Sequence, residues 1–284
     1  MTASIAEAYS WLPIALVCGL FMLLAAAELL RPLHLAPHEP VGRLRTNFGL
    51  GAINLAASAA LPLSTVAAAT FADAERIGLL HHLAAPPFAA AVATILARSL
   101  AQYGIHRVSH AVPLLWRIHR VHHCDTAVDV STALRNHPLE LLVVALPLWA
   151  LAIALGMSVP ALAAYEALAF GFALWGHANV GLPRGLDSIL RRLVVTPAMH
   201  HVHHSASRRE TDSNYGDVLS LWDRLFGTYG HLDADALRAM RPGLGPALDP
   251  GSCVLTTQLL LPALSQMSPG DYPVPATGDD GRLS

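Results

Sequence analysis

Lysine is absent from this chain, and charge of either sign is scarce. Of 284 residues, only 13% are charged and 54% are hydrophobic, and the mean hydropathy is +0.44. Soluble domains carry about 25% charged residues, so this composition indicates a protein embedded largely in a membrane. All basic residues are arginine and the formal net charge is -2, which excludes the basic footprint of a nucleic-acid-binding protein.

Cysteine is also rare. Cys18, Cys124 and Cys253 lack the spacing of a disulfide framework or of a zinc site. Cys124 directly follows a histidine pair, and we interpret it as a neighbour of a metal site rather than a ligand. We find neither a Ser–His–acid spacing nor a phosphate-binding glycine loop, so histidine is the residue type that can carry chemistry here.

Long apolar runs predict an all-α, integral-membrane helical bundle. The runs are Trp11–Leu30, Asn47–Thr70, Pro86–Ile105, Leu139–Gly156 and Pro160–Trp175. A crossing needs roughly 20 residues, so about four to five membrane helices are expected. The last two runs are short and flank a turn at residues 157–159; they could instead form a hairpin that only dips into the bilayer.

The arginines predict the orientation of the bundle. Arg31, Arg43 and Arg45 follow the first run, whereas Met1–Ser10 has no basic residue. Because positively charged loops stay in the cytoplasm, we expect the N-terminus outside and both histidine-rich regions on the cytoplasmic face, in a membrane of the bacterial inner-membrane type. We divide the chain into membrane helices with the first histidine boxes at 106–123 (1–180), a cytoplasmic histidine-rich helical cap (181–245) and a Pro/Gly-rich, partly disordered tail (246–284).

The histidines are spaced for helix faces. The chain has 16, of which eleven lie between His106 and His204. Residues at i, i+3 and i+4 share one helix face, and this spacing occurs once as an i, i+4 pair and twice as a full triple. It selects His106 and His110, then His119, His122 and His123, then His200, His203 and His204.

Eight imidazoles gathered on one side of a membrane predict a metal centre. Packed without a cation, they would lose free energy through desolvation. Neutral imidazole binds iron, zinc, copper and nickel, and one tetrahedral metal takes about four ligands, so eight or more histidines indicate two metals. His201 falls on another face of its helix, and we expect its replacement, like that of His231, to be nearly silent. His34 and His231 lie in loops and are expected to be solvated.

Four further polar residues flank the boxes. His177 ends the fifth apolar run on the side of the boxes, and we favour it as a ligand. His137 begins the fourth run, and its spacing leaves helix capping and metal ligation open. Glu140 and Asn179 are candidates for hydrogen bonds that orient ligand imidazoles from outside the coordination shell.

The boxes resemble those of the fatty acid hydroxylase/sterol desaturase superfamily. The resemblance covers roughly residues 98–229 and rests on "YGIHRVSHAVPLLWRIHRVHHCD", "ALRNHPLE", "WGHANVGLP", "TPAMHHVHHS" and "TDSNYGDVLSLWDRLFGTY". It implies that the eight box histidines and His177 hold two iron ions. In the last segment, which is expected to pack as a cap, Asn214 and Asp223 would position ligands or nearby backbone. The family often has an acidic residue about seven positions before the first box histidine, and Ser99 stands there instead.

The resemblance also implies a reaction. A membrane di-iron enzyme of this kind uses O2 and electrons from a separate protein to abstract hydrogen from a C–H bond of a fatty acyl or sterol-like lipid, which gives an alcohol or an alkene. We expect no catalytic residues beyond the metal ligands. Two alternatives stay open, namely a non-redox membrane protein for metal transport or storage, and a zinc hydrolase.

Overall fold

The computed structural model describes residues 2–34, 40–245 and 251–264. In these ranges the regular elements are helices, and only three isolated β-bridges occur. The all-α fold class is therefore confirmed.

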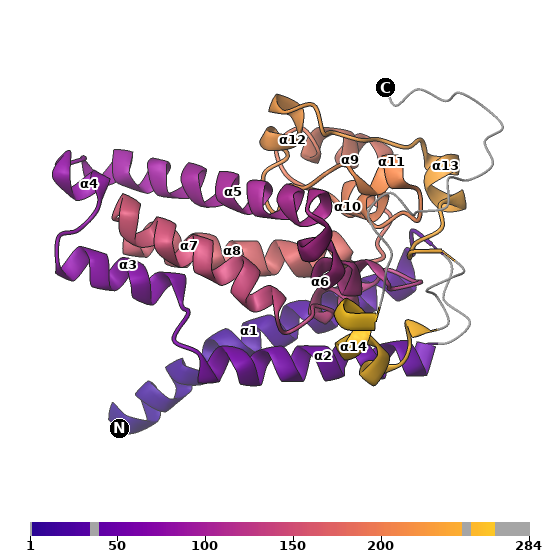
Figure 1. Cartoon of the computed structure of the whole chain (residues 1–284), viewed down its shortest axis with the longest axis horizontal. Coiled ribbons are helices and arrows are strands. Elements are labelled where there is room, and N and C mark those ends of the chain that lie inside the picture. Colours follow the sequence, from indigo (N-terminus) through magenta and orange to yellow (C-terminus); the bar gives the residue numbers. More distant parts are fainter. Residues whose placement is uncertain (1, 35–39, 246–250, 265–284) are drawn as a thin grey trace.

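Long helices lie side by side along the longest axis of the molecule (Figure 1). They are α1 (Thr2–Leu30), α2 (Pro40–Ala60), α3 (Thr65–Ala74), α5 (Pro87–Ala111), α7 (Glu140–Leu155) and α8 (Val159–His177). Helix α3 packs on α7 and α8, and α5 packs on α8. Alanines let these helices approach closely, since Ala68 and Ala69 of α3 share a buried core with Ala152 of α7.

Three described segments are long and apolar enough to cross a membrane. They are Val41–His82, Pro87–Ala111 and Val159–His177, while Ile14–Leu30 and Glu140–Leu155 are shorter apolar helices. The expected run Asn47–Thr70 is not one helix. It is divided between α2 and α3 at residues 61–64, where Pro62 lacks the N–H that would continue the helix and the Ser64 side chain accepts a hydrogen bond from the Ala67 N–H (3.2 Å).

The turn between α7 and α8 lies where the sequence placed it. Gly156 ends α7 in the left-handed region (φ 63°), and Pro160 stands in the first turn of α8. Two carbonyls of α7 accept from the Gly156 N–H, and the Thr94 hydroxyl accepts from the Ser158 N–H (2.9 Å). The two helices therefore form an antiparallel hairpin.

All histidine boxes lie at one end of the bundle. This end carries α6 (Pro113–His123) and the 3-10 helix η1 (Val130–Leu134). It also carries five short helices, which are α9 (Arg184–Leu190), α10 (Pro197–His203), α11 (Arg208–Thr211), α12 (Leu221–Leu225) and α13 (Ala234–Ala239). Helix α4 (Leu79–His82) lies at the opposite end (Figure 1). Residues 106–137 and 177–230 thus share one end, as the predicted number of crossings between them requires.

Helix α14 (Leu255–Leu264) covers the outer side of α6 and also contacts α2. Leu261 joins a core with Trp116 and Val121 of α6, and its carbonyl accepts a hydrogen bond from the buried Arg120 guanidinium (2.8 Å). Helix α14 therefore packs against the helix that carries three box histidines, although it lies within the tail that was predicted to be partly disordered. The predicted disorder of 246–250 and 265–284 falls outside the described residues.

Candidate metal centre

Two adjoining helices present the first five box histidines. His106 and His110 stand one turn apart near the end of α5, and α6 begins at Pro113 after a single extended residue, Val112. Pro113 pre-forms the first turn of α6 and cannot continue α5, so the chain turns sharply between them. His119, His122 and His123 then face the end of α5.

The remaining histidines come from α8 and α10. His177 is the last residue of α8, and α10 carries His200 and His203, with His204 directly after it. Thr196 caps α10 through a hydrogen bond from the Met199 N–H (3.4 Å). Gly176 permits the close approach of α10, because a Cβ atom there would lie 3.3 Å from the His200 ring.

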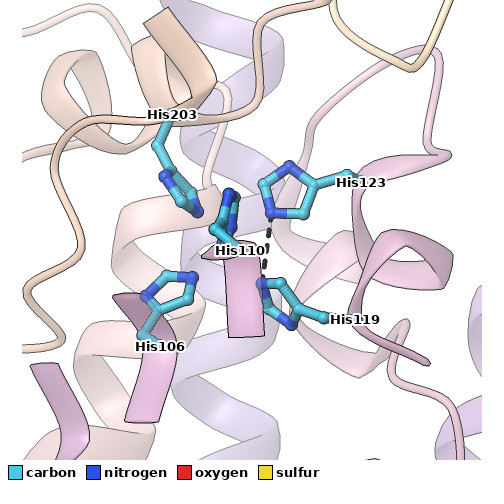
Figure 2. Close-up of side chains that lie close together, drawn as sticks. All are labelled: His106, His110, His119, His123 and His203. Carbon is cyan, nitrogen blue, oxygen red and sulfur yellow. Dashed lines mark hydrogen bonds between the residues drawn. The ribbon is translucent and has the colours of Figure 1, made fainter. Parts of the chain in front are cut away.

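Five histidines form a first group. His106, His110, His119, His123 and His203 each offer a ring nitrogen, and these atoms lie within 4.8 Å of one another. Figure 2 shows the five rings from three helices pointing toward a common centre. The Nε2 atoms of His119 and His123 are 3.2 Å apart.

Four histidines form a second group beside the first. The Nε2 atom of His177 lies 3.0 Å from the Nε2 atoms of His122 and His200, and 3.2 Å from that of His204. All four residues are buried. The two groups adjoin, since the His123 and His204 rings stack with their centroids 4.6 Å apart.

The opposite ring nitrogens are held by hydrogen-bond acceptors. Backbone carbonyls face Nδ1 of His106 (Tyr215, 2.9 Å), His122 (Arg135, 3.1 Å), His177 (Ala173, 2.6 Å) and His203 (Ser213, 2.7 Å). A carbonyl accepts only from N–H, so these four rings are protonated on Nδ1 and direct an Nε2 lone pair inward.

Converging lone pairs repel one another unless a cation lies between them. The inward Nε2 atoms of His106 and His203 and both ring nitrogens of His110 are buried and have no hydrogen-bond partner in the described part of the chain. Buried polar atoms in native proteins almost always have partners, and an orphaned group costs about 1–3 kcal/mol. The residues present therefore fit two metal ions, one in each group.

Burial keeps the imidazoles outside the long helices neutral. It lowers the pKa of His122, His123, His200 and His204 well below the usual value, and neighbouring histidines lower it further. The same burial lowers the pKa of His203 to about 3. Neutral imidazole is the form that binds a metal.

Three predicted positioning residues lie where they can orient ligands. Glu140 places Oε1 2.6 Å from His119 Nδ1. Asp223 accepts from the N–H groups of Tyr215 and Gly216 (both 2.8 Å), and so holds the loop whose Tyr215 carbonyl faces His106. Asn214, in the left-handed region (φ 54°), donates to the Met199 carbonyl of α10 (3.0 Å).

The prediction for Asn179 needs correction, and for His137 the structure favours capping, one of the two alternatives left open. The Asn179 side chain contacts no box imidazole; it accepts from the N–H groups of Leu33 (3.0 Å) and His34 (2.8 Å), and so fixes the chain after α1. His137 lies outside both groups. Its Nδ1 accepts from the Leu139 N–H (3.1 Å) and its Nε2 faces the Leu259 carbonyl (3.1 Å), so both ring nitrogens are engaged in tying α7 to α14.

His201 and His34 pack against each other, which the sequence did not predict. His201 does face away from the box histidines, but it is fully buried, and its Nε2 faces the His177 carbonyl (3.2 Å). His34 stacks on it, with ring centroids 5.1 Å apart and planes at 8°. A half-buried His231 contacts Arg191. The loop position of His34 gave no sign of this stacking, because it depends on a partner far along the chain.

A buried polar network beneath α6 was not predicted. Asp125 accepts from Arg43 (3.1 Å) and Asn47 (2.9 Å), and Arg135 donates to the Asn47 side chain (2.9 Å) and to the Val121 carbonyl (2.9 Å). Its signal was the presence of Arg43 and Asn47 at the start of an apolar helix. The network fixes Arg135, whose carbonyl faces His122.

A cavity of about 160 Å³ adjoins both groups. His106, His119, His122, His177 and His200 line it on the metal side. Apolar residues line it as well, namely Ile105, Val144, Ala169, Phe172 and Ala173. An alkyl chain can therefore lie directly beside the histidine groups.

The sequence profile described as "Fatty acid hydroxylase" matches residues 91–228, the segment that contains all nine histidines of the two groups. Over this segment, the chain is similar to the fatty acid hydroxylase/sterol desaturase superfamily. The resemblance inferred from the histidine boxes is thereby confirmed.

Curated relatives of this superfamily act on lipids. An alkylglycerol monooxygenase of Homo sapiens is 36% identical over 128 residues, which cover 45% of this chain and 27% of the relative. Ornithine lipid hydroxylase OlsE of Rhizobium tropici is 34% identical over 143 residues, or 48% of this chain and 41% of the relative. The chain thus spans well under half the length of these relatives. No solved structure matches it significantly.

Proposed function

We propose that this chain is a membrane-bound lipid oxygenase with two iron ions, one in each histidine group, and that it hydroxylates or desaturates a C–H bond with O2 and electrons from a separate donor protein. The observation that carries the proposal is the pair of adjoining histidine groups at the wall of an apolar-lined cavity. The names of the relatives, an alkylglycerol monooxygenase and an ornithine lipid hydroxylase, support a lipid substrate.

The chemistry of C–H oxidation would be supplied by iron when bound, and the protein's share is to hold and shield it. His106, His110, His119, His123 and His203 would bind one ion; His122, His177, His200 and His204 would bind the other. Carbonyls and Glu140 fix the rings with their lone pairs inward, which prearranges the ligands. Burial of nearly all nine histidines excludes bulk water, which protects a reactive site.

The membrane would deliver the substrate. Exposed apolar side chains such as Leu100 and Leu168 cover the outside of α5 and α8, and the alkyl-lined cavity lies between the same helices. We propose four to five crossings, with the histidine end and the 181–245 cap in the cytoplasm, because Arg107, Arg184 and other arginines gather there.

Metal transport or storage is a weaker proposal, since transporters place ligands along a path near the bilayer midplane, whereas these groups lie at helix ends. A zinc hydrolase is favoured by one observation. The Oε2 atom of Glu140 is buried with no hydrogen-bond partner within residues 2–34, 40–245 and 251–264, and Glu140 lines the cavity, where a carboxylate could act as a general base.

Oxygen consumption separates these functions. The purified protein, loaded with ferrous iron and supplied with a chemical reductant, is mixed with a hexadecyl glycerol ether, and O2 uptake and lipid products are measured together. We expect O2 uptake coupled to an oxidised lipid, and loss of both in His203→Ala. Hydrolysis of the matching hexadecanoyl glycerol ester to the acid and glycerol, with zinc and without O2, would support the hydrolase instead.

A further inference from the structure

The cavity has a polar wall that the histidines do not account for. Gln102 and Asp217 both line it. The Oδ1 atom of Asp217 accepts from the Tyr165 hydroxyl (3.0 Å) and from the Val218 N–H (2.7 Å). Its Oδ2 atom is buried and has no hydrogen-bond partner among the described residues. A carboxylate oxygen in this position is costly unless something donates to it.

The nearby cation is committed to another acid. Arg98 donates to both carboxylate oxygens of Glu166 (2.9 and 2.8 Å), and its Nη1 atom stays 3.7 Å from Asp217 Oδ2, beyond hydrogen-bond distance. Arg98, Glu166 and Asp217 together carry a formal charge of -1. Burial raises the pKa of Asp217 and Arg98 opposes this rise, so the carboxylate gains from a further donor. The wall therefore favours a hydrogen-bond donor or a cation over an acceptor.

This wall lies close to the metal ligands. Arg98, Gln102 and His106 follow one face of α5 at four-residue intervals, so Gln102 stands about 6 Å along the helix from His106. Asp217 comes two residues after Tyr215, whose carbonyl faces His106. A group bound at Asp217 would sit only a few bonds from the carbon presented to the histidines.

We propose that Asp217, with Gln102 beside it, is the subsite that receives a hydrogen-bond-donating group of the lipid, a hydroxyl or a protonated amine. This inference rests on the proposed function and names the part of the substrate that the site selects. The lipid group donates a hydrogen bond to Asp217 Oδ2, and this bond fixes which carbon of the lipid lies against the histidines. The alkyl part of the lipid packs against the apolar wall of the cavity.

Two matched lipids test the subsite by equilibrium binding, which needs no turnover. A hexadecyl glycerol ether offers two hydroxyl donors, and the same ether with both hydroxyls methylated offers only acceptors. The full chain in nanodiscs should bind the free glycerol ether about 10- to 100-fold more tightly, the usual range for a hydrogen bond to a charged group. Equal affinities in the wild-type protein would overturn the assignment.

Asp217→Asn sharpens the test, because an amide nitrogen in place of Oδ2 turns an acceptor into a donor while the shape is preserved. The variant should prefer the free glycerol ether less than the wild type does, or should bind the methylated ether more tightly. Thr65→Val is the matched control. Thr65 donates to Glu166 (2.8 Å) in the same network but does not line the cavity. The Thr65→Val variant should therefore prefer the free glycerol ether over the methylated ether as strongly as the wild type does. An unchanged preference in Asp217→Asn would refute the subsite.

Binding measurements test the subsite and turnover measurements test the oxygenase, so either proposal can fail without the other. Selective binding of the free ether without any O2-dependent product would leave the subsite standing and count against the oxygenase. Oxidation of both ethers at equal rates and equal affinities would leave the oxygenase standing and remove the subsite.

Discussion

The Oε1 atom of Glu140 lies 2.6 Å from the Nδ1 atom of His119, while Nε2 of the same ring faces His123 Nε2 at 3.2 Å. One carboxylate on α7 thus sets the direction in which a histidine on α6 offers its lone pair. Residues far apart in sequence meet here because α7 starts at the histidine end of the bundle.

Replacing Glu140 by Gln should weaken metal binding without unfolding the helices. A neutral amide holds the His119 ring less strongly than a carboxylate, and such outer partners typically change metal affinity about 10- to 100-fold. Ferrous-ion affinity, measured by competition with a chelator, checks this. Asp73→Asn, at the opposite end of the bundle, serves as the control and should keep the wild-type affinity; an unaltered affinity in Glu140→Gln would remove its orienting role.

His122→Ala and His203→Ala should each remove one metal rather than both. His122 belongs to the group of four and His203 to the group of five, so each change leaves the other ligand set complete. Metal analysis of the iron-loaded variants should give about one ion per chain, against two in the wild type. Both variants should lose O2 uptake with the lipid. Full metal content in either variant would contradict the ligand assignment.

The spacing of the histidines predicted much of this site and could do so for a local reason. His119, His122 and His123 share a face on any helix, so their grouping needs no tertiary information. The apolar runs likewise predicted α5, α7 and α8, because burial in lipid demands such runs. The two apolar runs between the second and third histidine boxes also predicted that both histidine regions lie at one end.

What the sequence could not predict depends on contacts between distant segments. His137 and Asn179 have the residue types and positions of site residues, yet they bind backbone of α14 and of the chain after α1. The stacking of His34 on His201 and the pairing of Asp125 with Arg43 join residues that are 167 and 82 positions apart. No spacing rule covers such distances.

His201→Ala should destabilise the protein instead of being silent. The ring is fully buried against His34 and faces the His177 carbonyl, so its removal leaves a cavity and an unpaired carbonyl. We expect a loss of roughly 2–4 kcal/mol in the free energy of unfolding, by analogy with other large-to-small changes. Thermal unfolding in detergent measures it. His231→Ala, at a half-buried site, is the control and should melt close to the wild type.

Acid should destabilise the metal-free protein from about pH 6.5 downward, because buried histidines must then gain protons. Burial lowers the pKa of His201 and of His203 from 6.5 to about 3. Unfolded histidines therefore bind protons at a higher pH than folded ones, and the free energy of unfolding falls as the pH drops from about 6.5 toward 3. Melting temperatures of the chelator-treated protein across this range check the sign.

His201→Ala supplies the matched comparison for this pH dependence. The variant has one fewer histidine that stays neutral in the folded state, so its melting temperature should fall less steeply with decreasing pH than that of the wild type. Parallel curves would mean that His201 does not contribute to the pH dependence.

Cysteine labelling should place the two ends of the bundle on opposite sides of the membrane. Ala84 and Ser188 are both exposed, Ala84 just beyond α4 at one end and Ser188 in α9 at the histidine end (Figure 1). In a background where Cys253 is changed to serine, a reagent that cannot cross the membrane should modify Ala84→Cys in intact cells and Ser188→Cys only after lysis, because arginine-rich loops stay in the cytoplasm. Labelling of Ser188→Cys but not of Ala84→Cys in intact cells would show that the orientation is the opposite of the predicted one. Labelling of both would contradict a bundle that spans the membrane between α4 and the histidine groups.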